Sequence, residues 1–228
     1  MPLTWSEVSA LEPIRLNLGG SGDCDPNPLY PNYVVVDLEP RDEHGVAHDL
    51  SAPLPLADAS VERVLSEHFL EHVPPDIVAA IFAECHRVLV PGGVARFAVP
   101  DYDHPKNRKF RERGHDPGHL DHVWFPIAAD LRELAEASPF TDIRFHQHWD
   151  GDAFVEGPID YTLGHVKRTP DHDPRNRCVG TGQFLARLSR DVGVILRRGP
   201  FVPHTHFLAQ RYHRLRMTSI VFDLVKEG

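Results

Sequence analysis

Hydrophobic and polar positions in the first forty residues form two apolar blocks with a glycine turn between them. Ile14, Leu16 and Leu18 alternate with polar residues, which is typical of a β-strand. Residues 19–22, Gly-Gly-Ser-Gly, then interrupt the pattern. Residues 34–36 are three consecutive valines, as expected of a strand buried on both faces of a parallel sheet. The pattern predicts strand, turn, connection and second strand.

An acidic residue, Asp37, closes the second strand about twenty residues after the glycine turn. In an α/β sheet, such a carboxylate accepts hydrogen bonds from ribose hydroxyls, and glycines let the backbone approach a ligand closely. The turn does not fit the GxGxxG pattern, and no helix pattern follows it at once. The sequence therefore favours a ligand with a ribose and without a pyrophosphate, although three glycines also suit a plain turn.

Further along the chain, strand and helix patterns follow one another, which predicts an α/β fold. Residues 102–124 and 149–180 carry no periodicity and are expected to be insertions. The expected strands are 46–50, 61–66, 94–99, 141–148 and 217–225. The expected helices are 76–90, closed by Pro91-Gly92-Gly93, then 127–137 and a helical element over 181–196.

Charge and cysteine content narrow the class of protein. The 228 residues carry a formal net charge of −9, yet residues 166–216 hold eleven Lys or Arg against three Asp or Glu. The acidic whole argues against broad nucleic-acid binding. No apolar run approaches the length of a membrane span, and the first residues lack a signal-peptide pattern. Three scattered cysteines indicate reduced thiols and a cytoplasmic location.

Five blocks of the sequence resemble class I S-adenosylmethionine-dependent methyltransferases, most closely the methyltransferase type 11 group. The blocks are LNLGGSG (16–22), VVVDLEP (34–40), the stretch HDLSAPLPLADASVERVLSEHFLEHV (48–73), ECHRVLVPGGVARFAVPD (84–101) and LRELAEASPFTDIRF (131–145). The resemblance implies a Rossmann-like, doubly wound sheet, mostly parallel with an antiparallel closing strand. It also implies a single domain over 1–228, in which 102–125 and 149–216 are acceptor-side, lid or dimerisation insertions.

The resemblance implies S-adenosylmethionine as cofactor. Carried over by position, the glycine turn lies against its methionine part, Asp37 binds the ribose, and Asp49 binds the adenine amino group. Asn17, Ser21 and Asp23 depart from the family's glycine motif. The complete set of implied cofactor residues is Leu18, Gly19, Gly20, Ser21, Asp37, Leu38, Asp49, Leu50, Ser66, Glu67 and His68.

Three histidine clusters invite other interpretations. His68 to His72 matches HxxEH, a zinc-peptidase pattern, but it lies within a methyltransferase block, so a helix-surface or packing role is favoured for His72. Residues 114–125 hold four candidates for a divalent metal or a general base: His115, His119, Asp121 and His122. His146 and His148 alternate with Gln147 and are predicted to share one face of a strand. No metal site is expected; a weak Mg²⁺ site near the acceptor stays open.

The histidines and aspartates around the expected pocket favour an oxygen acceptor, because a hydroxyl must lose its proton to accept a methyl group. The candidate catalytic residues are His119 and His122 as base, with Asp101 orienting the histidine or the acceptor, and His148 in reserve. The modest aromatic content of the acceptor-side loops suits a small polar acceptor, such as a sugar or oligosaccharide in polysaccharide assembly.

Alternative functions are methylation of a secondary metabolite, an amine or a protein side chain, and a non-catalytic subunit with the cofactor fold. The basic segment 166–216 carries an apolar stripe at helical spacing, which predicts a homodimer contact or a lid over the acceptor. The stripe consists of Phe184, Leu185, Leu188, Val192, Ile195 and Leu196.

Overall fold

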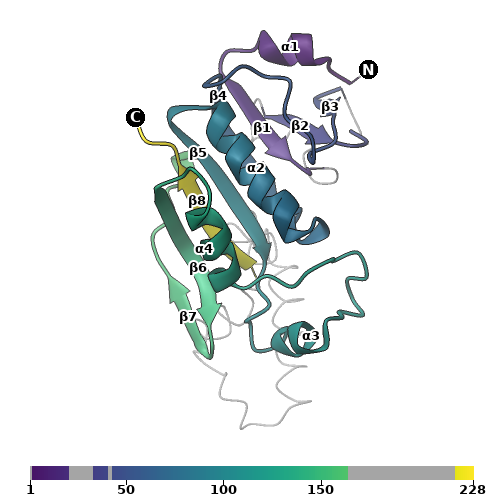
Figure 1. Ribbon diagram of the computed structural model, residues 1–228, viewed down its shortest axis with the longest axis vertical. Coiled ribbons are helices and arrows are strands. Elements are labelled where there is room, and N and C mark those ends of the chain that lie inside the picture. Colours follow the sequence, from purple (N-terminus) through teal and green to yellow (C-terminus); the bar gives the residue numbers. More distant parts are fainter. Residues whose placement is uncertain (1, 21–32, 41–42, 164–218) are drawn as a thin grey trace, which may run out of the picture. The chain divides into compact units, whose positions relative to one another are not determined.

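The computed structural model describes residues 2–20, 33–40, 43–163 and 219–228. Within them, one eight-stranded sheet has the order β3-β2-β1-β4-β5-β8-β6-β7 (Figure 1). The strands are β1 (Ile14–Leu18), β2 (Val34–Asp37), β3 (Gly45–Ala47), β4 (Val61–Glu67), β5 (Leu89–Pro100), β6 (Asp142–Asp150), β7 (Ala153–Glu156) and β8 (Ser219–Val225). The first five pair in parallel. β8 lies antiparallel between β5 and β6, which confirms the predicted fold class.

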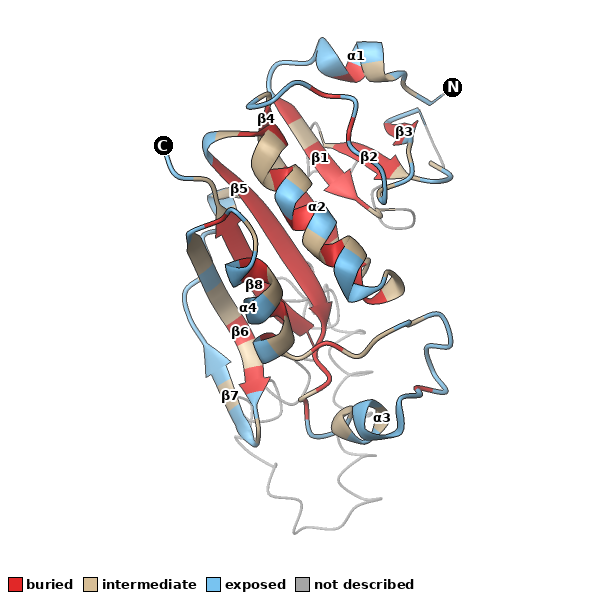
Figure 2. Cartoon of the chain, in the orientation of Figure 1, coloured by how far each residue is buried: buried red, intermediate tan, exposed pale blue. Residues whose placement is uncertain are grey.

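Helices α2 and α4 pack on one face of the sheet, with α2 beside β5 and α4 beside β6 (Figure 1). Their buried apolar residues meet those of the central strands, which are almost entirely buried (Figure 2). Phe82 of α2 packs on Phe97 and Phe222, and Phe222 stacks on Phe145. The helices are α1 (Trp5–Ser9), α2 (Pro75–Val88), α3 (Arg108–Arg113) and α4 (Ala128–Glu136), with 3-10 turns η1 (Leu70–His72) and η2 (Tyr161–Leu163).

Two predicted ends of elements are wrong, one because of strand pairing and one because of a local turn. The helix ends at Val88, before Pro91-Gly92-Gly93, because Leu89 turns to an extended backbone and pairs with Val61 of β4. The third strand ends at Ala47, because the Asp49 carboxylate accepts bonds from the Ser51 amide and hydroxyl and so forms a turn. Tertiary pairing and one Asx turn thus set the ends of these elements.

The prediction that residues 149–180 are irregular is wrong over the first part of this range. Residues 153–156 form β7, which pairs antiparallel with β6 across a tight turn that contains Gly151. Gly151 has a φ of +57°, the conformation that this two-residue hairpin turn requires. α1 was also not predicted. It is five residues long, and a capping box between Thr4 and Glu7 begins it.

The chain divides into two compact units, Met1–His165 with Ser219–Gly228, and Val166–Thr218. The second unit lies outside the described residues, and with it the predicted helical element 181–196 and its apolar stripe. The single domain and the homodimer contact therefore stay predictions. No helix in the described part of the chain is long and apolar enough to cross a membrane.

Candidate functional site

The glycine turn follows β1 and brings the backbone against neighbouring side chains. Gly19 has a φ of +68°, and its amide donates to the Val36 carbonyl at 2.9 Å. A β-carbon at Gly19 would lie 2.3 Å from the Phe69 ring, and one at Gly20 would lie 2.8 Å from Asn17 Nδ2. Gly19 in particular needs glycine, because its backbone is left-handed and the Phe69 ring fills the space that a side chain would take. Ser21 lies outside the described residues.

Acidic residues follow the next two strands. Asp37 is half-buried at the end of β2, and its Oδ1 accepts the Glu39 amide at 3.1 Å. Asp49 follows β3; hydrogen bonds from the Ser51 amide and hydroxyl hold the pKa of its carboxyl below the usual range. Leu38 is 69% exposed, and Leu50 is partly buried against the core. Both carboxylates have oxygen atoms that remain available to a ligand's hydroxyl or amino groups.

The end of β4 carries the third predicted group. Ser66 is buried, and its hydroxyl donates to the carbonyl of Leu18, which is itself buried at the end of β1. Glu67 is partly exposed. His68 has a φ of +55°, its amide donates to the Ala98 carbonyl at 2.7 Å, and its Nε2 lies 3.1 Å from Ser219 Oγ.

The parallel pairing of β1, β2, β3 and β4 places all these predicted cofactor residues at the carboxyl edge of the sheet. In an open α/β sheet this edge is where ligands bind. The structure brings together ten of the eleven implied residues, and Ser21 is the one outside it. Their individual roles stay predictions.

A histidine-rich cluster adjoins this edge. Glu71 in η1 is fully buried, and its Oε1 lies 3.2 Å from His68 Nδ1 and 3.9 Å from both His72 Nε2 and His122 Nε2. His122 comes from the loop after α3, and its pKa is lowered mainly by burial. His119 stacks on His122 with ring centroids 4.6 Å apart and is exposed.

The loop that carries His122 is fixed to η1. The Val123 amide donates to the Glu71 carbonyl at 2.9 Å, and the Trp124 indole donates to the Leu70 carbonyl at 2.7 Å. On the other side, the Tyr102 hydroxyl lies 2.6 Å from His122 Nδ1. These contacts hold the loop that carries His122 beside η1, which follows the end of β4.

Asp101, by contrast, has a different set of partners from the predicted one. It is fully buried; its Oδ2 accepts the Trp149 amide at 2.6 Å and its Oδ1 accepts the Asp103 amide at 2.9 Å. Burial raises the pKa of its carboxyl to about 6. Among the described residues, no hydrogen bond joins Asp101 to His119 or His122. Asp101 ties the end of β5 to β6, and its predicted role of orienting the histidine or the acceptor stays a prediction.

The prediction that His146 and His148 share one face is also wrong. The pairing of β6 with β8 shifts between Phe145 and Gln147, so a bulge reverses the alternation. His146 Nε2 contacts Asp223 at 2.8 Å, whereas His148 lines an open pocket of about 400 Å³ beside α4. Charged and apolar side chains share the wall of this pocket, and the charged ones include Asp103, Arg132, Glu133 and Asp150. Burial lowers the pKa of His148.

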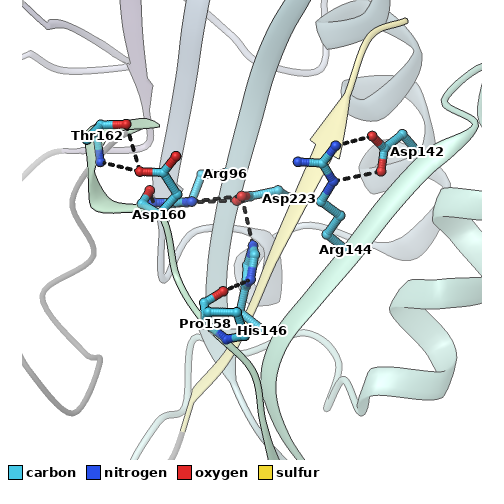
Figure 3. Close-up of polar contacts among 8 residues, drawn as sticks. All are labelled: Arg96, Asp142, Arg144, His146, Pro158, Asp160, Thr162 and Asp223. Carbon is cyan, nitrogen blue, oxygen red and sulfur yellow. Dashed lines mark hydrogen bonds and ion pairs between the residues drawn. The ribbon is translucent and has the colours of Figure 1, made fainter.

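Sequence analysis missed two features of the polar interior. Arg96 of β5 and Asp223 of β8 form a buried bidentate ion pair, with both N–O distances 2.7 Å (Figure 3). The sequence did carry one signal for this pair, because Asp223 is an acid within the apolar run of the closing strand. Glu71 was considered only as part of HxxEH, and nothing local in the sequence indicates that His122 reaches it.

Comparison with known proteins agrees with this geometry. A family model described as "Methyltransferase domain" matches residues 32–97. A Mycolicibacterium smegmatis protein, named a probable S-adenosylmethionine-dependent methyltransferase, is 38% identical over 96 residues, which are 42% of this chain. The match covers 34% of that protein, so the chain spans about a third of the length of this curated relative.

Solved structures share the fold at low sequence identity. A SAM-dependent methyltransferase from Archaeoglobus fulgidus superposes with a TM-score of 0.51 at 14% identity, over 93% of this chain and 85% of that chain. Phosphoethanolamine N-methyltransferase 2 from Haemonchus contortus, solved with S-adenosyl-L-methionine, gives 0.51 at 14% identity, over 94% and 48%. The chain therefore carries a methyltransferase domain with the fold of the class I S-adenosylmethionine-dependent methyltransferases.

Proposed function

We propose that this protein binds S-adenosylmethionine and transfers its methyl group to a hydroxyl of a small polar acceptor, such as a sugar or oligosaccharide. One observation carries the proposal: a glycine turn that admits no side chain, followed by Asp37, Asp49 and the end of β4, all at one sheet edge. When bound, S-adenosylmethionine supplies a methyl group on a positively charged sulfur.

Each element at this edge then has a distinct role in holding the cofactor. Gly19, Gly20 and Ser21 accommodate the methionine part, and Asp37 accepts bonds from the two ribose hydroxyls. Asp49 accepts a bond from the adenine amino group. The remaining predicted contacts complete the site: Leu38 and Leu50 against adenine, and Leu18, Ser66, Glu67 and His68 near the sulfur.

The acceptor side supports a polar substrate. β6 runs parallel to β5, since both pair antiparallel with β8, so the pocket at the end of β6 opens at the same edge. Asp103, Arg132, Glu133 and Asp150 offer charged groups there that hydroxyl-rich molecules can hydrogen-bond. Alignment of the acceptor oxygen with the methyl group and the sulfur is the main contribution that the protein makes to the rate.

A hydroxyl acceptor also has to lose a proton, and we place that step at His119, which stacks on His122. His119 is the exposed member, so an acceptor can reach it. His122 lies behind it, with its Nδ1 bonded to Tyr102. Asp101 contributes indirectly, because it holds the start of this loop against β6.

Cofactor binding and an acceptor panel test this proposal. Calorimetry should detect S-adenosylmethionine binding, and Asp37→Ala should weaken it by about 1.5–3 kcal/mol, the range for hydrogen bonds to a charged group. Glu43→Ala is the matched control, because Glu43 is an exposed acid before β3, away from the carboxyl edge. Equal effects of the two variants would contradict the ribose assignment.

The panel separates the alternatives. Release of S-adenosylhomocysteine with saccharides supports the proposal, whereas turnover only with amines, secondary metabolites or a protein contradicts the hydroxyl acceptor. An absence of cofactor binding would indicate the non-catalytic subunit.

A further inference from the structure

The cluster around the buried Glu71 carboxylate has the arrangement of a metal site. We infer that Glu71, His72 and His122 bind one divalent transition-metal ion of the zinc type. The inference does not depend on methyl transfer, since it concerns side chains beside the predicted cofactor edge and not the cofactor itself. Imidazole and carboxylate donors of this kind are common zinc ligands.

The distances suit a metal after a small contraction. Glu71 Oε1 lies 3.9 Å from His72 Nε2 and 3.9 Å from His122 Nε2, and all three donor atoms lie within 4.8 Å of one another. Donors at zinc–ligand distances of about 2.0–2.2 Å in tetrahedral geometry are about 3.3–3.5 Å apart. Movement of the side chains by less than about 1 Å would bring the donors to these distances.

In both His72 and His122, the hydrogen bonds to other groups are made by Nδ1, which leaves Nε2 free to bind a metal. His72 Nδ1 faces two acceptors, the Asp121 carbonyl at 3.2 Å and its carboxylate at 3.3 Å, so Nδ1 carries the hydrogen. The Tyr102 hydroxyl donates to Asp116 at 3.2 Å and therefore accepts from His122 Nδ1 at 2.6 Å. Both Nε2 lone pairs then point to Glu71, and such outer hydrogen bonds are typical of metal-bound histidines.

Glu71 supplies a second, independent observation. Its side chain is fully buried, and within the described part of the chain neither carboxylate oxygen has a hydrogen-bond donor in suitable geometry. A buried carboxylate that faces two imidazole lone pairs is costly, because three acceptors converge there. A divalent cation at their common focus would remove this cost.

His68 offers the competing explanation. Its Nδ1 lies 3.2 Å from Glu71 Oε1, so a protonated His68 would itself balance the carboxylate. In the HxxEH pattern of zinc peptidases, the two histidines bind from one helix. Here His68 lies before η1 with a left-handed backbone, and its Nε2 contacts Ser219. The converging pair is instead His72 and His122, from separate segments. The inferred site therefore departs from the expectation of no metal, which stays untested.

An exposed neighbouring group completes the coordination. His119 and Asp121 form a second candidate set with His122, and both are exposed. Asp121 can approach the ion from the solvent side, or water can occupy the remaining position. The inner set is preferred because it contains Glu71, whose fully buried carboxylate has no hydrogen-bond donor among the described residues, whereas His119 and Asp121 are exposed.

Zinc titration of chelator-treated full-length protein tests the inference. Calorimetry should give one zinc ion per chain, and cobalt substitution should give the visible absorption of a tetrahedral site. Glu71→Gln and His122→Ala should each weaken zinc at least about 100-fold, and Tyr102→Phe about 10–100-fold, as loss of an outer contact does. His115→Ala is the matched control, an exposed histidine of the same loop, and should leave affinity unchanged.

Three results would overturn the metal site: no stoichiometric zinc binding, equal binding in wild type, Glu71→Gln and His122→Ala, or equal loss in His115→Ala. If His122→Ala fails to fold by circular dichroism, Tyr102→Phe carries the test, since it keeps the ring and removes only the hydroxyl. S-adenosylmethionine affinity of the zinc-free protein is measured in parallel. Failure of the metal site and failure of the methyltransferase proposal are thereby distinguishable.

Discussion

Asp223 on β8 and Glu71 after β4 are both buried carboxylates, and their surroundings are opposite. Asp223 accepts two bonds from the Arg96 guanidinium at 2.7 Å each and contacts His146 Nε2 at 2.8 Å (Figure 3). Glu71 has no guanidinium or ammonium beside it in the part of the chain that the structure describes, and its oxygens face imidazoles.

The difference separates a structural carboxylate from one suited to a ligand. The charge of Asp223 is balanced, and Arg96 in turn reaches the Asp160 carbonyl, so the network joins β5, β8 and β6 without any added group. A buried ionised group without such balance is destabilising. The described side chains balance the charge of Glu71 only in part. The metal inference rests on this observation.

Removal of the balanced carboxylate should have the largest effect. Asp223→Ala leaves the Arg96 guanidinium buried without its counter-charge, so the free energy of unfolding should fall by about 3–5 kcal/mol. Urea unfolding at neutral pH measures this. Asp142→Ala is the control, because Asp142 and Arg144 form a much more exposed pair on the neighbouring strand, and the loss there should stay under about 1 kcal/mol.

Similar losses in these two variants would mean that burial of the Arg96–Asp223 pair does not set its contribution to the free energy of unfolding. Asp223 could then no longer serve as the structural carboxylate with which Glu71 is compared.

A fall in pH should weaken the ion pair between Arg96 and Asp223. Burial alone would raise the pKa of Asp223, but hydrogen bonds and charge from Arg96 and His146 lower it overall. A lowered folded-state pKa contributes stability above the unfolded value of about 4, and that stability is lost as the pH falls through the folded value. The stability advantage of wild type over Asp223→Asn should therefore shrink below about pH 4.

The measurement is urea unfolding of both proteins from neutral pH to acid. Asp101 has the opposite linkage: its pKa is raised to about 6, so it adds stability as the pH falls through that value. It contributes equally to both proteins and cancels in their difference. A constant difference across the acid range would contradict the assignment.

Neutralisation of Glu71 should have the smallest effect and the opposite sign. In metal-free protein, Glu71→Gln removes an unbalanced buried charge and provides an amide donor to the His72 and His122 lone pairs. We expect no loss, and a gain of up to about 1 kcal/mol, in the free energy of unfolding. Thermal or urea unfolding of chelator-treated protein checks it. A loss comparable to that of Asp223→Asn would show that His68 already balances Glu71.

The sequence by itself determined the repeating part of the fold. The alternating and continuous apolar runs of β1, β2, β4 and β8 are local patterns, and so are the glycine turn and the acid of β2. Because side-chain period and turn chemistry act over a few residues, they predicted the strands, the glycine turn and the acid that follows β2, whereas the other predicted cofactor residues came from the resemblance to a family.

Tertiary structure decided which polar side chains meet. The bulge in β6 sends His146 to Asp223 and His148 to the pocket beside α4. Asp101 is occupied by the Trp149 and Asp103 amides, and the loop from α3 brings His122 to Glu71. Such contacts join residues distant in the chain, and their geometry depends on register, bulges and loop anchoring. No local pattern carries that information, because a side chain's type does not specify its partner.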